Sequence, residues 1–194
     1  MLIEPEAYLN SLHQQLEVMP PEKQLAFGAF CCESHLPDYL GFSMEEHWGN
    51  PDLFREAIDI SWAAIAGEHE EDAKLQALLA KCVDATPDAD DFETVLVDFA
   101  QDAAIMICHL IKFMESKDPQ SIVSAASRAR DLVDAKIQFT HQLDPTDPAL
   151  ESKIANDPMM QTELSRQDAA LQEILQAGSS SDLAQLRTQW FRSS

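Results

Sequence analysis

Prolines recur along this chain at positions that suit the first turn of an α-helix, where a missing N–H group costs no hydrogen bond. The five positions are Pro5, Pro21, Pro51, Pro119 and Pro158. Three of these prolines directly follow a side chain that can cap a helix, in the pairs Asn50-Pro51, Asp118-Pro119 and Asp157-Pro158. Only 5 glycines occur among 194 residues, whereas chains rich in β-turns need many. The sequence therefore predicts helices separated by short connections.

Apolar residues between the prolines repeat with the 3.6-residue period of a helix. The segment from about residue 90 to residue 117 has few helix breakers and is apolar on most sides, which is typical of a buried central helix. Short connections favour antiparallel neighbours. We therefore expect an all-α fold, an antiparallel up-and-down helical bundle of about seven or eight helices around that long central helix. The length of the chain suits a single helical domain over residues 1–194.

The chain is strongly acidic, with a formal net charge of −21 at pH 7. Residues 1–97 hold 4 of the 13 Lys and Arg residues but 20 of the 34 Asp and Glu residues, so the N-terminal half carries most of the negative charge. Such a surface repels phosphate backbones, which disfavours direct nucleic-acid binding. Two interpretations remain open. The acids keep the protein soluble, or they recognise a basic partner protein, in one version by mimicking a nucleic acid.

The four cysteines, Cys31, Cys32, Cys82 and Cys108, do not have the spacing of a disulfide framework. We expect free thiols, since a bridge between adjacent cysteines would be strained and buried thiols suit a reducing compartment. The N-terminal residues lack the basic flank and apolar core of a signal peptide. The most apolar stretch, residues 103–111, is too short to span a bilayer. The sequence thus predicts a cytoplasmic protein without a membrane segment.

The segment Cys31-Cys32-Glu33-Ser34-His35 is the first candidate for chemistry. On a helix, Cys31 and Cys32 lie four and three residues before His35, so that thiolates and an imidazole can share one face. That arrangement supplies half of a zinc site or a thiol–imidazole pair. The alternative is structural, because cysteine is among the most buried residue types and behaves as a small hydrophobic residue.

The second candidate is the acidic run Asp88-Ala89-Asp90-Asp91, which precedes the predicted central helix. Carboxylates such as those of Asp90 and Asp91 can bind Mg²⁺ or Ca²⁺. The structural alternative is that Asp90 or Asp91 caps the helix and that the other acids interact favourably with its positive end.

A ferritin-like di-iron site requires Glu-x-x-His motifs on inward faces of a bundle. None of the six histidines has a carboxylate three residues before it. The sequence also lacks a phosphate-binding loop, a Gly-rich dinucleotide turn and zinc-finger spacing. We therefore expect no cofactor.

Three segments of the chain, residues 26–39, 53–62 and 87–92, resemble domain-of-unknown-function family 416, the YjaG-like bacterial proteins. The first segment reads AFGAFCCESHLPDY, and the third reads PDADDF. The similarity is in order along most of the chain and continues more weakly to Asn156, Pro158, Glu163 and Gln167. The resemblance implies a helical fold and a bacterial cytoplasmic protein, and it implies no activity.

Three functional hypotheses follow. The leading one is a non-enzymatic helical protein-interaction module that binds another protein or a second copy of itself, because apolar stripes that include Leu183, Leu186 and Trp190 can seal the bundle or form a dimer face. The alternative is a metal-dependent or thiol-based enzyme that uses Cys31, Cys32, Glu33 and His35, with the Asp90 and Asp91 cluster nearby. The second alternative is an acidic nucleic-acid mimic that binds a basic protein.

Overall fold

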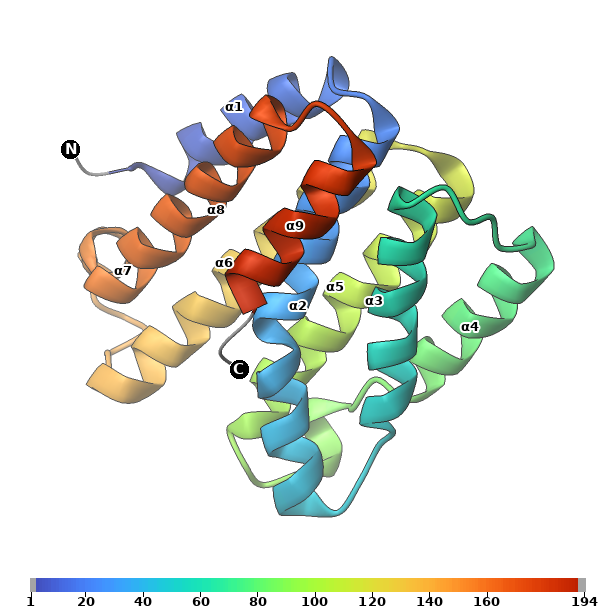
Figure 1. Ribbon diagram of the computed structural model, residues 1–194. Coiled ribbons are helices and arrows are strands. Elements are labelled where there is room, and N and C mark those ends of the chain that lie inside the picture. The colour runs from blue at the N-terminus through green and yellow to red at the C-terminus, as the bar shows by residue number, and fades with distance from the viewer. Residues whose placement is uncertain (1–2, 192–194) are drawn as a thin grey trace.

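Residues 3–191 are described by the computed structural model, and they form nine α-helices and one short 3-10 helix with no strand among them (Figure 1). The helices are α1 (Pro5–Glu17), α2 (Pro21–Glu46), α3 (Pro51–Ile65), α4 (Asp72–Asp84), α5 (Leu96–Ser116), α6 (Pro119–His141), α7 (Leu150–Asn156), α8 (Pro158–Gln176) and α9 (Ser180–Phe191), and the 3-10 helix is η1 (Ala89–Asp91). The predicted all-α bundle is confirmed.

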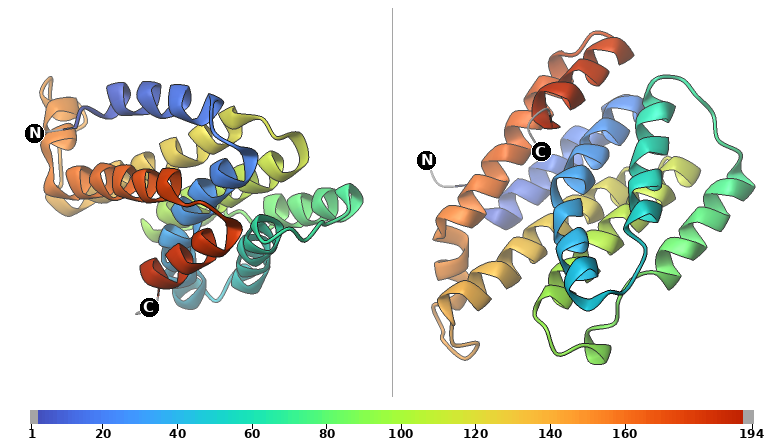
Figure 2. Two further views of the ribbon diagram at one scale, coloured as in Figure 1. Left: turned by 45° about the horizontal axis from the view of Figure 1, so that its top comes forward. Right: turned by 60° about the horizontal axis from the view of Figure 1, so that its bottom comes forward.

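Helices α2 and α5 lie in the middle of the bundle, where they pack against each other. Helices α3 and α4 pack on one side of this pair, and α6 and α8 lie on the other, where α1 packs on α6 and α7 packs on α8 and α6 (Figure 1). Figure 2 shows that α4 and α7 lie at opposite ends of the molecule. The C-terminal helix α9 crosses the outside of α2 and also contacts α3 and α8.

The three predicted caps are present at the starts of α3, α6 and α8. Asn50 Oδ1 accepts a hydrogen bond from the Leu53 N–H at 3.3 Å, and the Asp118 and Asp157 carboxylates accept bonds from the second residues of α6 and α8. Each proline occupies the first helical position, where no donor is lost. Cap and proline therefore fix these helix starts from local sequence alone.

The central helix starts later than predicted, at Leu96 instead of about residue 90. Asp88, not Asp90 or Asp91, acts as a cap, and it caps the short η1 turn. Phe92 follows in an extended conformation and packs its ring edge-on against Phe42 and Trp48, at centroid distances of 4.9 and 5.4 Å. This aromatic packing draws the segment away from the α5 axis, and local spacing cannot reveal it.

The count of nine helices slightly exceeds the predicted seven or eight, because residues 150–176 form two helices. Asp157 is extended, with ψ 139°, and it both ends α7 and caps α8. The residue before a proline is disfavoured in the helical conformation, which explains the break at Pro158.

One hydrophobic core joins the helices, and α2 approaches its neighbours most closely at Gly28. A Cβ atom placed on Gly28 would lie 2.6 Å from Ile122 Cδ1 and 3.0 Å from Leu110 Cδ1. Gly28 therefore permits the close contact of α2 with α5 and α6. Among residues 3–191, no helix is long and apolar enough to cross a membrane.

Candidate functional site

Glu33 is a nearly buried carboxylate that connects three helices. It lies on α2 with 9% of its surface exposed, and its oxygens accept hydrogen bonds from Arg55 of α3 at 2.8 Å and from the Trp62 indole at 2.9 Å. Arg187 of α9 adds a two-pronged contact, with Nε and Nη2 at 3.0 and 3.1 Å from the two Glu33 oxygens. A buried charge is tolerated when it is paired and hydrogen-bonded, and all of these contacts serve that purpose.

The guanidinium of Arg187 has a complete binding seat on the surface of α2 and α3. Besides Glu33, it donates from Nη2 to Asp59 Oδ1 at 2.6 Å. Its central carbon lies 5.3 Å from the centroid of the Trp62 ring, within the range of a cation–π contact. Two carboxylates and an aromatic face are the groups that recognise a guanidinium best. We call Glu33, Asp59 and Trp62 the arginine seat.

A second charged network surrounds His35, two residues further along α2. His35 Nδ1 lies 3.3 Å from Asp38 Oδ2, and its Nε2 lies 3.4 Å from Glu163 Oε1 and 3.1 Å from Arg166 Nη2. Burial by itself lowers the pKa of His35, but the hydrogen bonds with Asp38 and Glu163 outweigh it and raise that pKa above its usual 6.5. The imidazole thus links α2 to α8.

The carboxylates of this network are held in their charged forms. Burial alone would raise the pKa of Glu163, whereas the hydrogen bond and charge of His35 and the charge of Arg166 lower it from 4.5 to about 2. Asp38 also forms an ion pair with Lys136 of α6, and its pKa is lowered because the bonds with His35 and Lys136 outweigh burial. The network therefore ties α6 and α8 to α2.

The two adjacent cysteines lie in the core, on the same helix as these networks. Cys31 and Cys32 are free thiols with 0% and 1% exposure. Burial raises the pKa of both thiols well above the usual value, because no solvent stabilises the thiolate. The structure thus supports the structural interpretation of Cys31 and Cys32, and it gives neither thiol the environment of a nucleophile.

The predicted metal candidates do not converge. Glu33 and His35 belong to separate networks on α2, whereas Asp90 and Asp91 are exposed on η1. Within the described part of the chain, no three His, Cys, Asp or Glu side chains are grouped in a way that could hold a metal ion. Glu33 and His35 instead serve as anchors for neighbouring helices.

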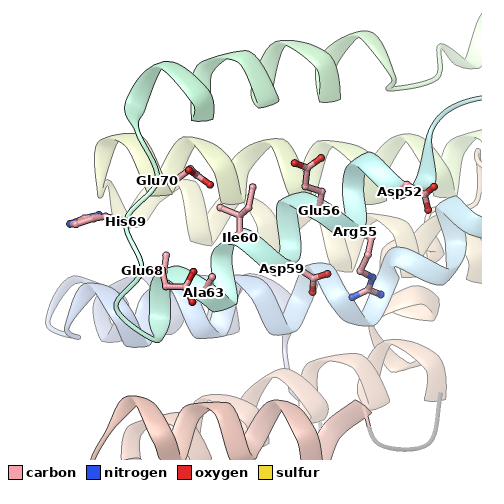
Figure 3. Close-up of a pocket in the computed structure, with 10 residues that line it drawn as sticks. Asp52, Arg55, Glu56, Asp59, Ile60, Ala63, Glu68, His69 and Glu70 are labelled. Carbon is pink, nitrogen blue, oxygen red and sulfur yellow. The ribbon is translucent and has the colours of Figure 1, made fainter.

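An open hollow of about 550 Å³ lies along the outer face of α3 and continues to the loop before α4 (Figure 3). Its floor is apolar and consists of Ile60, Ala63 and Ala64. Its other lining residues are Asp52, Arg55, Glu56, Asp59, Glu68, His69 and Glu70. Five carboxylates and one arginine give this lining a formal charge of −4 with His69 neutral. We call it the acidic hollow.

Several of the charges in the acidic hollow already have partners. Arg55 points from α3 toward α2, where it donates to Glu33 (Figure 3). Glu70 accepts from Lys74 at 2.7 Å, and Asp59 accepts from Arg187. The single cation of the hollow is therefore engaged with a buried carboxylate, which leaves the opening negative.

Sequence reasoning missed the partners that make these networks. Arg187 and Lys136 carry no local motif, and Asp38 and Glu163 belong to segments singled out only through the family resemblance. The scarcity of basic residues was a usable signal. With only 13 basic residues against 34 acidic ones, each arginine, Arg187 included, was a candidate partner for a buried acid.

Comparison with known proteins gives relatives over most of the chain. The model of a family described as "Protein of unknown function (DUF416)" matches residues 11–193. The proteins named "Uncharacterized protein YjaG" of Escherichia coli and Salmonella typhimurium are 30% and 29% identical to this chain over 104 residues. Each alignment covers 53% of this chain, which in turn spans about half (52%) of the length of these relatives.

A solved structure shows the same fold. The crystal structure of a DUF416 family protein from Shewanella baltica superposes with a TM-score of 0.82 and covers 93% of each chain. Its sequence identity is 22%, so the comparison bears on the fold. The helical bundle is therefore shared with an experimentally determined structure.

Proposed function

The chain belongs to the DUF416 family, and we propose that it is a non-enzymatic protein-binding module of the cytoplasm whose acidic hollow receives a basic segment of a partner protein. The relatives and the family carry no assigned activity, so the proposal rests on the geometry of this chain. The observation that carries it is the acidic hollow itself, an open depression with an apolar floor and a carboxylate rim.

The charges on the rim favour a partner with lysine and arginine side chains. Asp52, Glu56 and Glu68 are exposed, so that their carboxylates can pair with cations without a large desolvation cost. Long-range attraction from a chain of net charge −21 also accelerates the approach of a basic partner.

The floor of the hollow supplies the apolar contact that exposed ion pairs lack. Ile60, Ala63 and Ala64 are half-buried and lie between the charged side chains. The aliphatic stems of lysine and arginine can cover such a floor while their charged ends reach the rim. A basic segment therefore fits both the shape and the charge of this surface.

The buried networks support a binding role over a catalytic one. The charged side chains of α2 are occupied by helix-to-helix contacts at Glu33 and His35, and the thiols of Cys31 and Cys32 lie in the core. None of these groups lines the acidic hollow. The proposal therefore places recognition on α3 and stability on α2.

The test is titration of the protein with a peptide of six lysines and a peptide of six arginines, followed by calorimetry at low and physiological salt. We expect binding that weakens as salt rises, because the charges are exposed. The variant Glu56→Gln/Glu68→Gln should weaken binding about fivefold or more, at roughly 0.5 kcal/mol for each exposed pair.

The matched control is Glu17→Gln/Glu45→Gln, which removes two exposed carboxylates from α1 and α2 outside the hollow. Equal weakening by both double variants would show that only net charge matters and would contradict a defined docking site. Absence of peptide binding by the unmodified protein at low salt would refute the proposal.

A further inference from the structure

Asp59 belongs to two features at once. It lines the acidic hollow, and it is the exposed member of the arginine seat that holds Arg187 of α9. Figure 3 shows Arg55 and Asp59 on the same flank of α3, facing away from α4. The acidic hollow is thus already in contact with an arginine of this chain, at its edge nearest to α9.

The arginine seat recognises its ligand by more than charge. Arg187 engages both oxygens of Glu33 and one oxygen of Asp59 while its planar group lies over Trp62. A lysine ammonium carries one compact charge and cannot reproduce a two-pronged contact of this kind. The seat therefore favours arginine over lysine.

Helix α9 packs on the bundle with one buried side chain in its first turn and several half-buried side chains further along. Leu183 is the residue of α9 that is fully buried, while Leu186, Trp190 and Phe191 are half-buried against the core. Trp190 packs edge-on against Phe30 at 4.8 Å and donates from its indole to Glu173. Elements with few buried side chains are the first to open locally, so α9 is poised to detach.

Detachment of α9 leaves no buried charge without a partner. When Arg187 leaves, Glu33 retains its hydrogen bonds with Arg55 and with the Trp62 indole. Asp59 is 53% exposed at its side chain and returns to water. The large cost of an unpaired buried carboxylate is therefore avoided.

From this shared residue we infer that α9 is an internal competitor of the partner: Arg187 occupies the arginine seat in the closed form, and an arginine of the bound segment takes its place and releases α9. The inference rests on the proposed function of the acidic hollow, and it specifies that the partner segment contains arginine. Because only the open form offers the full seat, the closed form reduces the apparent affinity.

The test compares three variants for binding of the six-arginine peptide by calorimetry. Arg187→Gln removes the competitor and should tighten binding about threefold or more. Leu183→Ala weakens the hold of α9 without a change of charge and should also tighten binding. Arg130→Gln, which removes an arginine paired with Asp131 on α6, makes the same change of net charge as Arg187→Gln and should leave binding nearly unaltered.

A second measurement follows α9 directly by hydrogen–deuterium exchange of residues 180–191. Binding of the six-arginine peptide to the unmodified protein should accelerate exchange in α9, since coupling between two binding events is reciprocal. The six-lysine peptide should accelerate it less, because lysine competes poorly for the seat.

The outcomes separate this inference from the function on which it rests. Peptide binding with unchanged exchange in α9, and with equal affinity for Arg187→Gln, Leu183→Ala and Arg130→Gln, would overturn the inference and leave the docking site standing. Peptide binding by none of the proteins would overturn both. Tighter binding by Arg187→Gln and by Leu183→Ala, but not by Arg130→Gln, supports the inference.

Discussion

The indole N–H of Trp62 donates a 2.9 Å hydrogen bond to Glu33, which fixes the polar end of a largely buried side chain against a largely buried carboxylate. The contact joins α3 to α2, and Arg187 then covers the same pair from α9. A tryptophan suits this position because its ring packs in the core while its single donor meets an acceptor. The charges of α2 thereby hold the bundle together.

Replacement of Glu33 by alanine should destabilise the protein by about 2–3 kcal/mol. The loss leaves the buried Trp62 donor and two guanidinium groups without their acceptor, and the cost is moderated because Arg55 and Arg187 are partly exposed. Urea unfolding followed by circular dichroism measures the change. The control is Glu45→Ala on the exposed side of the same helix, which should alter stability by less than about 0.5 kcal/mol. Similar costs for the two variants would contradict the anchoring role of Glu33.

Two glycines of α2 should respond to alanine in opposite directions. At Gly28 the added methyl group meets Ile122 and Leu110 in a filled core, so Gly28→Ala should destabilise by about 1 kcal/mol in spite of better helix propensity. A Cβ atom placed on Gly41 would meet no atom within 4 Å apart from its own turn of helix, so Gly41→Ala should stabilise by about 0.5–1 kcal/mol. Thermal unfolding of the two variants side by side is the measurement, and a gain of stability in Gly28→Ala would show that α2 is less tightly packed than described.

Acid should destabilise the protein through Glu163. Its pKa is about 2 when folded and 4.5 otherwise, so its contribution is complete above pH 4.5 and is lost as the pH falls toward 2. The contribution is on the order of 3 kcal/mol and is shared with His35. In Glu163→Gln the unfolding free energy should fall less steeply between pH 4.5 and pH 2. A curve parallel to that of the unmodified protein would contradict the assignment.

His35 should make the stability of the protein fall as the pH rises. Because its pKa is raised in the folded state, its charged form stabilises the fold fully below pH 6.5, and this contribution is lost as the pH rises through the folded pKa. The groups that face it are Asp38, Glu163 and Arg166, with Lys136 behind Asp38. Chemical-shift titration of His35 should show a midpoint above 6.5, and a midpoint below 6.5 would mean that burial and Arg166 outweigh the two carboxylates.

The four thiols should react slowly in the folded protein. Cys31, Cys32, Cys82 and Cys108 are at most 6% exposed, and burial raises the pKa of Cys82 to about 12. Labelling with a colourimetric disulfide reagent should be on the order of 100-fold slower than in urea, since it requires local opening. Rapid labelling of one thiol in the native protein would favour the alternative hypothesis of a thiol-based enzyme.

The helices themselves could be predicted from the sequence because their signals are local. Asn50, Asp118 and Asp157 cap α3, α6 and α8 as expected, each followed by a proline that cannot sit comfortably further inside a helix. The apolar face of α3 is also visible as spacing, and the residues of that stripe are buried. Signals of this kind involve neighbours within one or two turns, so they need no knowledge of the rest of the chain.

The partners of each buried charge were decided only by the tertiary structure. Glu33 and Arg187 are 154 residues apart, and the local sequence around either residue does not predict the contact with the other. The same holds for the late start of α5, which depends on the packing of Phe92 against Phe42 and Trp48. Hydrophobic periodicity states which face of a helix is buried but not against which helix, because apolar contact is non-directional. The pairing of helices, and with it the place of Asp59 between the acidic hollow and α9, follows from how all the faces pack together.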